Sequence, residues 1–144
     1  MINMVQVTID VNVGNLTEML GPQKAKQVQR QGLDYSAQEM IRVLMINSPV
    51  DHGLLKMWHL SSMSDDEARI RSPASYAQMV NDGTAPHWIY PVNKKMLYWE
   101  GAEHPVPYVY HPGTTGQHFV EDSIADVEGR LAGYFLKALE EVMG

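Results

Sequence analysis

The sequence of 144 residues contains no cysteine, which excludes disulfide bonds, thiolate metal sites and thiol nucleophiles. It also lacks any run of roughly 18 apolar residues, the length that a membrane-spanning helix needs. The first residues show no basic segment followed by an apolar stretch, so we expect no secretory signal peptide. With 44% hydrophobic and 19% charged residues, the composition is typical of a globular chain, and we expect residues 1–144 to form a single domain.

Basic charge is scarce. The chain has 11 Lys and Arg against 17 Asp and Glu, which gives a net charge of -6. This balance argues against a protein that reads nucleic-acid sequence. The excess of acidic side chains falls in residues 116–144, which hold six acidic and two basic side chains. A solvated helix face is the simplest interpretation, and the alternative is a surface that must not bind phosphate.

Reactive motifs are absent as well. No serine lies in a GxSxG elbow, and no lysine follows a glycine-rich turn as in a phosphate-binding loop. The six histidines form no HxH, HxxH or HExxH pair, so the local spacing of zinc enzymes is missing. They are His52, His59, His87, His104, His111 and His118. We therefore expect no catalytic residue, no metal ligand and no cofactor.

The first half of the chain has clear periodicity. Residues 5–13 alternate apolar and polar side chains, which predicts a half-buried strand. Residues 17–47 predict a long helix, with weak points at Gly21-Pro22 and at Gly32, that ends before Pro49. Residues 54–73 predict a β-hairpin that turns at 64–66, although the pattern leaves open which face of its first strand is buried.

The second half predicts a short helix at 75–81, which Gly83 ends in a left-handed conformation. Short strands are expected at 88–90, 96–100 and 106–110, with Ile89, Leu97 and Trp99 supplying apolar mass. The last helix is expected over 117–142, with Thr114 or Thr115 as its initiating residue. The fold class is therefore α+β: a small, mostly antiparallel sheet packed by a long helix in the N-terminal half and a long C-terminal helix.

Three stretches, taken in order, resemble a known family. The first is Ser48-Pro49-Val50-Asp51-His52-Gly53-Leu54-Leu55. The second runs from Tyr76-Ala77 to Val80-Asn81-Asp82-Gly83-Thr84. The third runs from His87-Trp88-Ile89-Tyr90-Pro91 through Leu97-Tyr98-Trp99 to His111-Pro112-Gly113-Thr114. Together they cover about residues 35–142 and are similar to the tail-completion (neck, or head-tail joining) proteins of long-tailed bacteriophages. The chain departs from the family pattern at His52, where Thr is usual, and at Asn81, where Glu is usual.

The resemblance implies a structural protein of the virion, made in the host bacterial cytoplasm and placed at the junction of head and tail. Such proteins form rings around the DNA channel, commonly of six copies, and contact adjacent neck and tail proteins. DNA would pass through without sequence-specific binding, and no membrane would be involved. The motif residues have turn and packing roles in this interpretation. They are Pro49, Asp51, Gly53, Leu54, Tyr76, Gly83, Thr84, His87, Ile89, Pro91, Trp99, His111, Pro112 and Gly113.

Two other functions compete with this one. The chain could be another phage tail component, such as a tail terminator or a minor tail protein. It could instead be a metal enzyme that depends on its histidines. For the ring itself, the first strand and residues 85–115 are the expected contacts with neighbouring subunits, because edge strands readily pair with another chain. These two regions are also expected to have the least apolar burial of their own.

Overall fold

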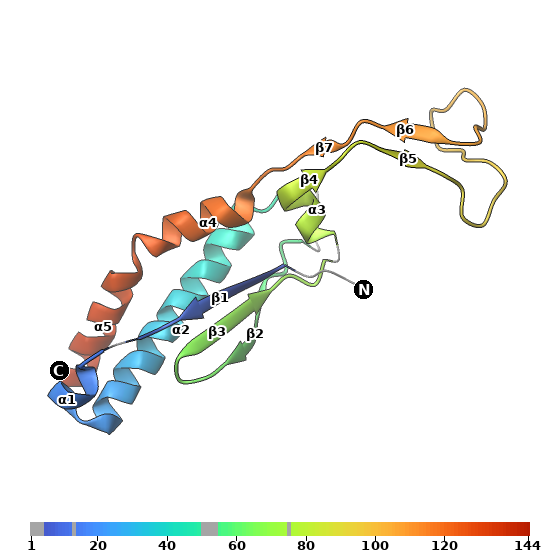
Figure 1. The fold of residues 1–144 in the computed structure, drawn as a ribbon. Coiled ribbons are helices and arrows are strands. Elements are labelled where there is room, and N and C mark those ends of the chain that lie inside the picture. The colour runs from blue at the N-terminus through green and yellow to red at the C-terminus, as the bar shows by residue number, and fades with distance from the viewer. Residues whose placement is uncertain (1–4, 13, 50–54, 75) are drawn as a thin grey trace.

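A computed structural model describes residues 5–12, 14–49, 55–74 and 76–144. It is 45% helical and 20% strand, with a small antiparallel sheet beside long helices, so the expected α+β class is confirmed. Figure 1 shows two regions of different character, a body of helices packed on a sheet and a thin double-stranded projection. Within the described ranges, no helix combines the length and the apolarity needed to cross a membrane.

The sheet of the body has three strands, β1 (Gln6–Asp10), β2 (His59–Met63) and β3 (Glu67–Arg71), in the order β1-β3-β2. All neighbours are antiparallel, and Val7 lies opposite Ile70 on the buried face. The alternation predicted for the first strand is therefore confirmed over residues 6–10. The expectation that this strand buries little apolar surface is wrong, because Val7 and Ile9 belong to the core.

The hairpin and its turn are also confirmed, and the structure settles which of its residues are buried. β2 itself is mostly exposed. The apolar side chains that enter the core come from just before it, at Leu55 and Trp58. The turn is held by Asp65, whose carboxylate pairs with Lys26 at 3.0 Å and with Arg30 at 2.7 Å.

The long helix begins where the sequence predicted a break. α1 (Leu16–Leu20) ends before Gly21, and α2 (Pro22–Asn47) starts with Pro22 in its first turn, where the missing N–H of proline costs nothing. The prediction of a second weak point at Gly32 is wrong, because α2 continues through this residue without interruption. Gly32 is buried and the ring of Phe135 lies on it, at 2.2 Å from where a Cβ would stand.

Two C-terminal helices pack along α2 (Figure 1). They are α4 (Phe119–Glu128) and α5 (Leu131–Met143), so the single helix predicted over 117–142 is wrong. The interruption falls at Gly129-Arg130, where glycine weakens the helix and Gly133 bonds back to the carbonyl of Arg130. The core lies between these layers, with Leu33, Leu44 and Ile70 fully buried.

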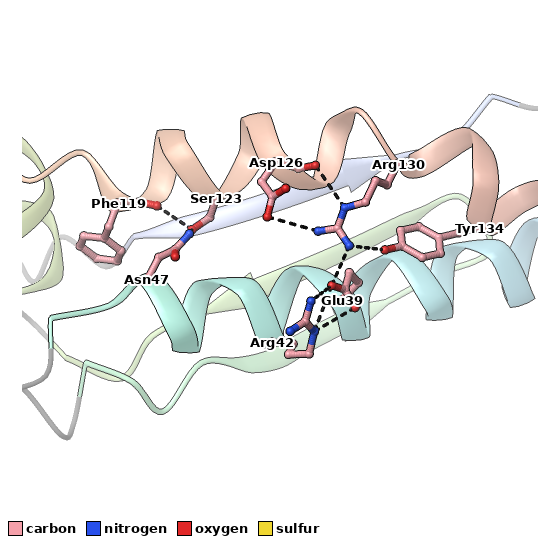
Figure 2. A network of polar contacts seen from close by, with 8 residues as sticks. All are labelled: Glu39, Arg42, Asn47, Phe119, Ser123, Asp126, Arg130 and Tyr134. Atoms are coloured by element: carbon pink, nitrogen blue, oxygen red, sulfur yellow. Dashed lines mark hydrogen bonds and ion pairs between the residues drawn. The ribbon is translucent and has the colours of Figure 1, made fainter.

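Arg130, at this interruption, joins α5 to α2 through polar contacts (Figure 2). Its guanidinium donates to the carboxylate of Glu39 at 2.9 Å, to the hydroxyl of Tyr134 at 3.0 Å and to Asp126 at 3.3 Å. Glu39 also accepts from Arg42. The guanidinium of Arg42, and after it that of Arg130, lowers the pKa of the Glu39 carboxyl although partial burial acts in the opposite sense.

The rest of the chain forms α3 (Ala77–Asp82) and four short strands: β4 (Gly83–Thr84), β5 (His87–Ile89), β6 (Val109–His111) and β7 (Thr114–Thr115). The strand expected at 96–100 is reduced to a single bridge between Leu97 and Val106. Thr114 and Thr115 do not initiate the last helix, because they pair with β4. That helix begins at Phe119, after His118 in a left-handed conformation at φ 51°.

Candidate assembly surface

Residues 83–116 form a projection that we call the arm (Figure 1). β4 pairs with β7 at its base, and β5 pairs with β6 farther out, both antiparallel. The register places Trp88 opposite Tyr110 and Ile89 opposite Val109. The arm is therefore one long, irregular hairpin that leaves the body after α3 and returns to it before α4.

Close approach of the two chains at the base of the arm requires glycine. Gly83 has φ +81°, and a Cβ there would stand 2.4 Å from the carbonyl oxygen of Thr114. Gly113 has φ +88°, and its Cβ would stand 2.3 Å from the carbonyl oxygen of Thr84. The amide of Thr114 donates to the hydroxyl of Thr84 at 3.1 Å. The base is thus a tight, specific junction in which side chains at the two glycines would clash with backbone.

Asn81 joins the arm to the body. It is 3% exposed, and its side-chain oxygen accepts the amide of Val120 at 2.9 Å, in the first turn of α4. Its side-chain nitrogen donates to Glu121 at 2.9 Å, and its backbone carbonyl accepts the amide of His118. The side chain caps α4 from another element, satisfying amides that have no partner inside the helix. Position 81, where the family pattern usually has Glu, is therefore buried inside this subunit.

Aromatic side chains line one face of the arm. Trp88 lies 5.0 Å from Tyr110 and 5.4 Å from Tyr108, and Tyr90 lies 6.1 Å from Tyr108, as ring centroids. These are distances of favourable aromatic contact. Each of the four rings nevertheless stays at least half exposed, from 51% for Trp88 to 61% for Tyr90. We call these four side chains the aromatic ladder.

The arm carries little charge for its length. It holds six of the twelve aromatic residues of the chain but only two basic and two acidic side chains, Lys94, Lys95, Glu100 and Glu103. Its net charge is therefore zero, and the whole of the net charge of -6 belongs to the body. Neutral, aromatic-rich surface is the composition found at the centre of protein–protein contacts.

The body does not support the arm. The hydrophobic core, as far as the structure describes it, draws on the sheet, α2, α3, α4 and α5 and includes no residue of 83–116. An isolated two-stranded hairpin is at best marginally stable in water. A large exposed apolar patch on a folded chain commonly marks a binding site for another molecule. Both arguments make the aromatic ladder a candidate binding surface.

Two histidines of the arm lie side by side, as the ligands of a metal site would. His87 and His111 stack with centroids 5.1 Å apart across β5 and β6. The Nδ1–H of His87 donates to the carbonyl of Ala85, and the Nδ1 of His111 accepts the amide of Gly113. Over the part of the chain that is described, no group of three or more His, Asp or Glu side chains is placed to hold a metal ion. These two histidines therefore form hydrogen bonds with the backbone beside β5 and β6.

The residues singled out in the sequence gather mostly on the arm. Gly83, Thr84, Gly113 and Pro112 form its base, and the others in the third motif lie along it. Those others are His87, Ile89, Pro91, Trp99 and His111. Pro49 follows the end of α2 and Tyr76 precedes α3, both on the body. Asp51, Gly53 and Leu54 fall outside the described residues.

Two parts of this surface were missed from the sequence. Trp99 was expected to supply apolar mass to the small sheet, but it is 49% exposed near the distal end of the arm. The members of the aromatic ladder were not recognised as one surface. The signal was present, because Trp88 and Tyr90 are two residues apart, as are Tyr108 and Tyr110, and that spacing places each pair on one face of a strand.

Comparisons with known proteins add no relative: no family model matches the chain, and neither a curated protein nor a solved structure matches it.

Proposed function

We propose that this chain is a structural subunit that assembles with copies of itself through the arm, as a tail-completion protein in the neck of a tailed phage. The observation that carries the proposal is the aromatic ladder on a hairpin that the body does not cover. The order of the three sequence motifs supports the phage assignment. A catalytic role would need convergent reactive groups, whereas the arm gathers glycines, threonines and aromatic rings.

The shape of the subunit suits a ring. The arm extends away from the body instead of folding over it (Figure 1). A contact between the arm of one copy and the body of the next joins two different surfaces. Such heterologous contacts generate a closed ring when the rotation between copies divides a full turn.

The charge of the body suits a channel for DNA. Exposed carboxylates lie along α4 at Glu121, Asp122 and Asp126. A surface of negative charge repels phosphate, so that DNA would slide past without being held. Binding of DNA with micromolar affinity at 50 mM salt would contradict this part of the proposal.

Removal of the arm tests self-assembly. Residues 85–113 would be replaced by Asn-Gly. This two-residue hairpin turn connects Thr84 to Thr114 and keeps the pairing of β4 with β7. We expect the shortened chain to remain folded, with an unchanged far-ultraviolet spectrum for its helices, and to sediment as a monomer. The full chain should form a discrete ring-sized species at the same concentration. Equal oligomeric states of the two chains would overturn the proposal.

A second experiment tests the place of the protein in the virion. The chain would carry an epitope tag at its C-terminus, and gold-labelled antibody would locate it on intact phage particles by electron microscopy. Label at the head-tail junction supports the neck assignment. Label along the tail, or its absence from particles, would overturn that assignment without touching self-assembly through the arm.

A further inference from the structure

The free edge of the sheet faces a groove. Among the described residues β1 is an edge strand that pairs only with β3, and it lies on the side of the sheet toward α4 and α5 (Figure 1). Between them is a groove of about 300 Å³ that residues 6–10 line on one side. Ile124, Val127 and Leu131 of the helices, together with Met40 of α2, supply its apolar lining. Glu128 and Asp10 lie along the same groove.

The two edges of this sheet differ. On β2 the pairing shifts between Leu60 and Ser62, and such a bulge blunts an edge against further pairing. β1 keeps an unbroken register with β3 over all five residues, from Gln6 to Asp10. It contains no proline, lysine or bulge, which are the usual devices that protect an edge. The outer side of β1 is therefore fit to accept a further strand.

The arm has strand edges that match. β6 itself, Val109–His111, contains no proline and no Lys, Arg, Asp or Glu side chain, and Pro107 and Pro112 limit the stretch that can pair to residues 108–111. Tyr108 and Tyr110 lie on one face of this strand, and Val109 lies on the other. A strand that pairs with β1 turns one face to the helices that line the groove and the other to solvent. The aromatic face would then cover Ile124, which is 38% exposed in the isolated chain.

Charge decides the direction of docking. Asp10 and Glu128 make no ion pair within the described chain, and Asp10 stands opposite another acid, Glu67, in β3. Lys94 and Lys95, near the distal end of the arm, also make no ion pair in the ranges described. When the distal end of the arm lies at the Asp10 end of β1, opposite charges meet. β6 then runs antiparallel to β1, because its first residue is the one nearer the tip.

We propose that the β1 groove is the receptor for the arm of a second copy, with β6 added antiparallel to β1. The aromatic ladder then lies on α4 and the start of α5, and Lys94 and Lys95 approach Asp10 and Glu128. Main-chain hydrogen bonds provide affinity, and the rings on one face of the arm provide selectivity. This inference rests on the proposed function, since it names where on the neighbouring copy the arm binds.

Crosslinking tests the pairing directly, because the natural chain has no cysteine. One preparation would carry Thr8→Cys and a second Val109→Cys, since these side chains share the outer face in the proposed pairing. Side chains directly opposite in neighbouring strands have Cβ atoms about 5 Å apart, within reach of a disulfide. Gln6→Cys and Asp10→Cys, each mixed with Val109→Cys, cover the other registers. We expect a covalent dimer in the best-matched mixture and none with either variant alone.

The other edge of the sheet provides the matched control. Ser61→Cys places a thiol on β2, which is also exposed and on the same sheet, and should not crosslink to Val109→Cys. Equal yields at the two edges would mean that collision, not docking, produces the bond, and would overturn the proposal. So would the absence of any crosslink at all three β1 positions in a chain that still assembles.

Substitution in the groove gives an independent measurement. Ile124→Lys places a charge under the proposed aromatic face and should weaken self-association at least about tenfold. Ala125→Lys, the next exposed residue of α4, lies outside the groove and should leave the dissociation constant within about twofold. Asp10→Lys should weaken association about threefold, and adding Lys94→Glu to the same chain should restore it.

The failures of the two proposals are distinguishable. If arm removal abolishes assembly while Ile124→Lys and the β1 cysteines have no effect, the groove is not the receptor and the proposed function stands. If the full chain is a monomer at every concentration tested, both are overturned.

Discussion

The body and the arm differ in where their apolar side chains lie. In the body, alternating strands and amphipathic helices bury their apolar side chains, such as Leu33 and Ile70. Their charged side chains, such as that of Arg69, are exposed. In the arm, the largest apolar side chains are exposed and there is almost no charge. Burial therefore accounts for the stability of the body. The described core includes no residue of the arm, and our proposal is that a neighbouring copy covers it. The following predictions separate the two.

The largest effect is expected in the core of the body. Leu33 is fully buried, and Leu33→Ala should lower the free energy of unfolding by about 3 kcal/mol through lost burial and an unfilled cavity. Leu136→Ala is the matched control, because that side chain is 59% exposed and its loss should cost less than about 0.5 kcal/mol. Urea denaturation of the dilute monomer measures both. Similar losses at the two positions would contradict the assigned core.

The second effect reverses this pattern. Trp88→Ser should leave the unfolding of the body unchanged, because Trp88 is not part of the described core, and should weaken self-association by about 2 kcal/mol. Sedimentation equilibrium gives the association constant, and urea denaturation gives the stability of the body. Val92→Ser is a control on the same arm, 91% exposed but outside the aromatic ladder, and should weaken association much less. A loss of body stability with Trp88→Ser would break the division between the two regions.

The third effect lies at the joint. Asn81→Ala removes the acceptor for the amide of Val120 and should cost about 1 to 2 kcal/mol. Asn81→Asp retains an acceptor there but faces Glu121 and Asp82, so it should recover only part of the stability. Protection of the Val120 amide from hydrogen exchange reports the cap itself. Unchanged protection in Asn81→Ala would show that the cap is not needed.

The smallest effect concerns pH. Arg42 and Arg130 lower the pKa of Glu39 in the folded chain below its ordinary value of 4.5. The stabilisation is therefore present above about pH 4.5 and is lost as pH falls through the folded-state value. Glu39→Gln should reduce the melting temperature at pH 7 by a few degrees and by less near pH 3. A difference between the two chains that grows toward acid pH would contradict this sign.

Two glycines show how far the sequence predicted the fold. Gly32 was expected to weaken a helix, and nothing was expected at Gly129, although glycine has the same low helix propensity at both. In the structure the helix continues through Gly32 and is interrupted at Gly129. The ring of Phe135 lies on Gly32 and needs the missing Cβ, whereas Gly129 lies exposed at the interruption between α4 and α5. A contact across 103 positions in sequence decides the first case, and local pattern holds no trace of it.

Local pattern served better where one face of an element is buried. The alternation in β1, the hairpin with its turn near Asp65, and the stripe along α2 were all predicted, since burial imposes a period on them. In the arm, the two-residue spacing of Trp88 and Tyr90, and of Tyr108 and Tyr110, indicates a shared face but not burial, because the described core includes no residue of the arm. Gly83 was correctly predicted to end α3, but the pairing of His87 with His111 joins residues whose spacing no local signal fixes.

The most direct test of the account compares amide hydrogen exchange in the arm and the body, below and above the concentration at which the chain assembles. The account predicts fast exchange in β5 and β6 of the dilute monomer and strong protection of the same amides after assembly. The amides of α2 and β3 should be protected equally in both states. Protection of the arm that is already complete in the monomer, or that does not rise on assembly, would contradict the claim that a neighbouring copy covers it.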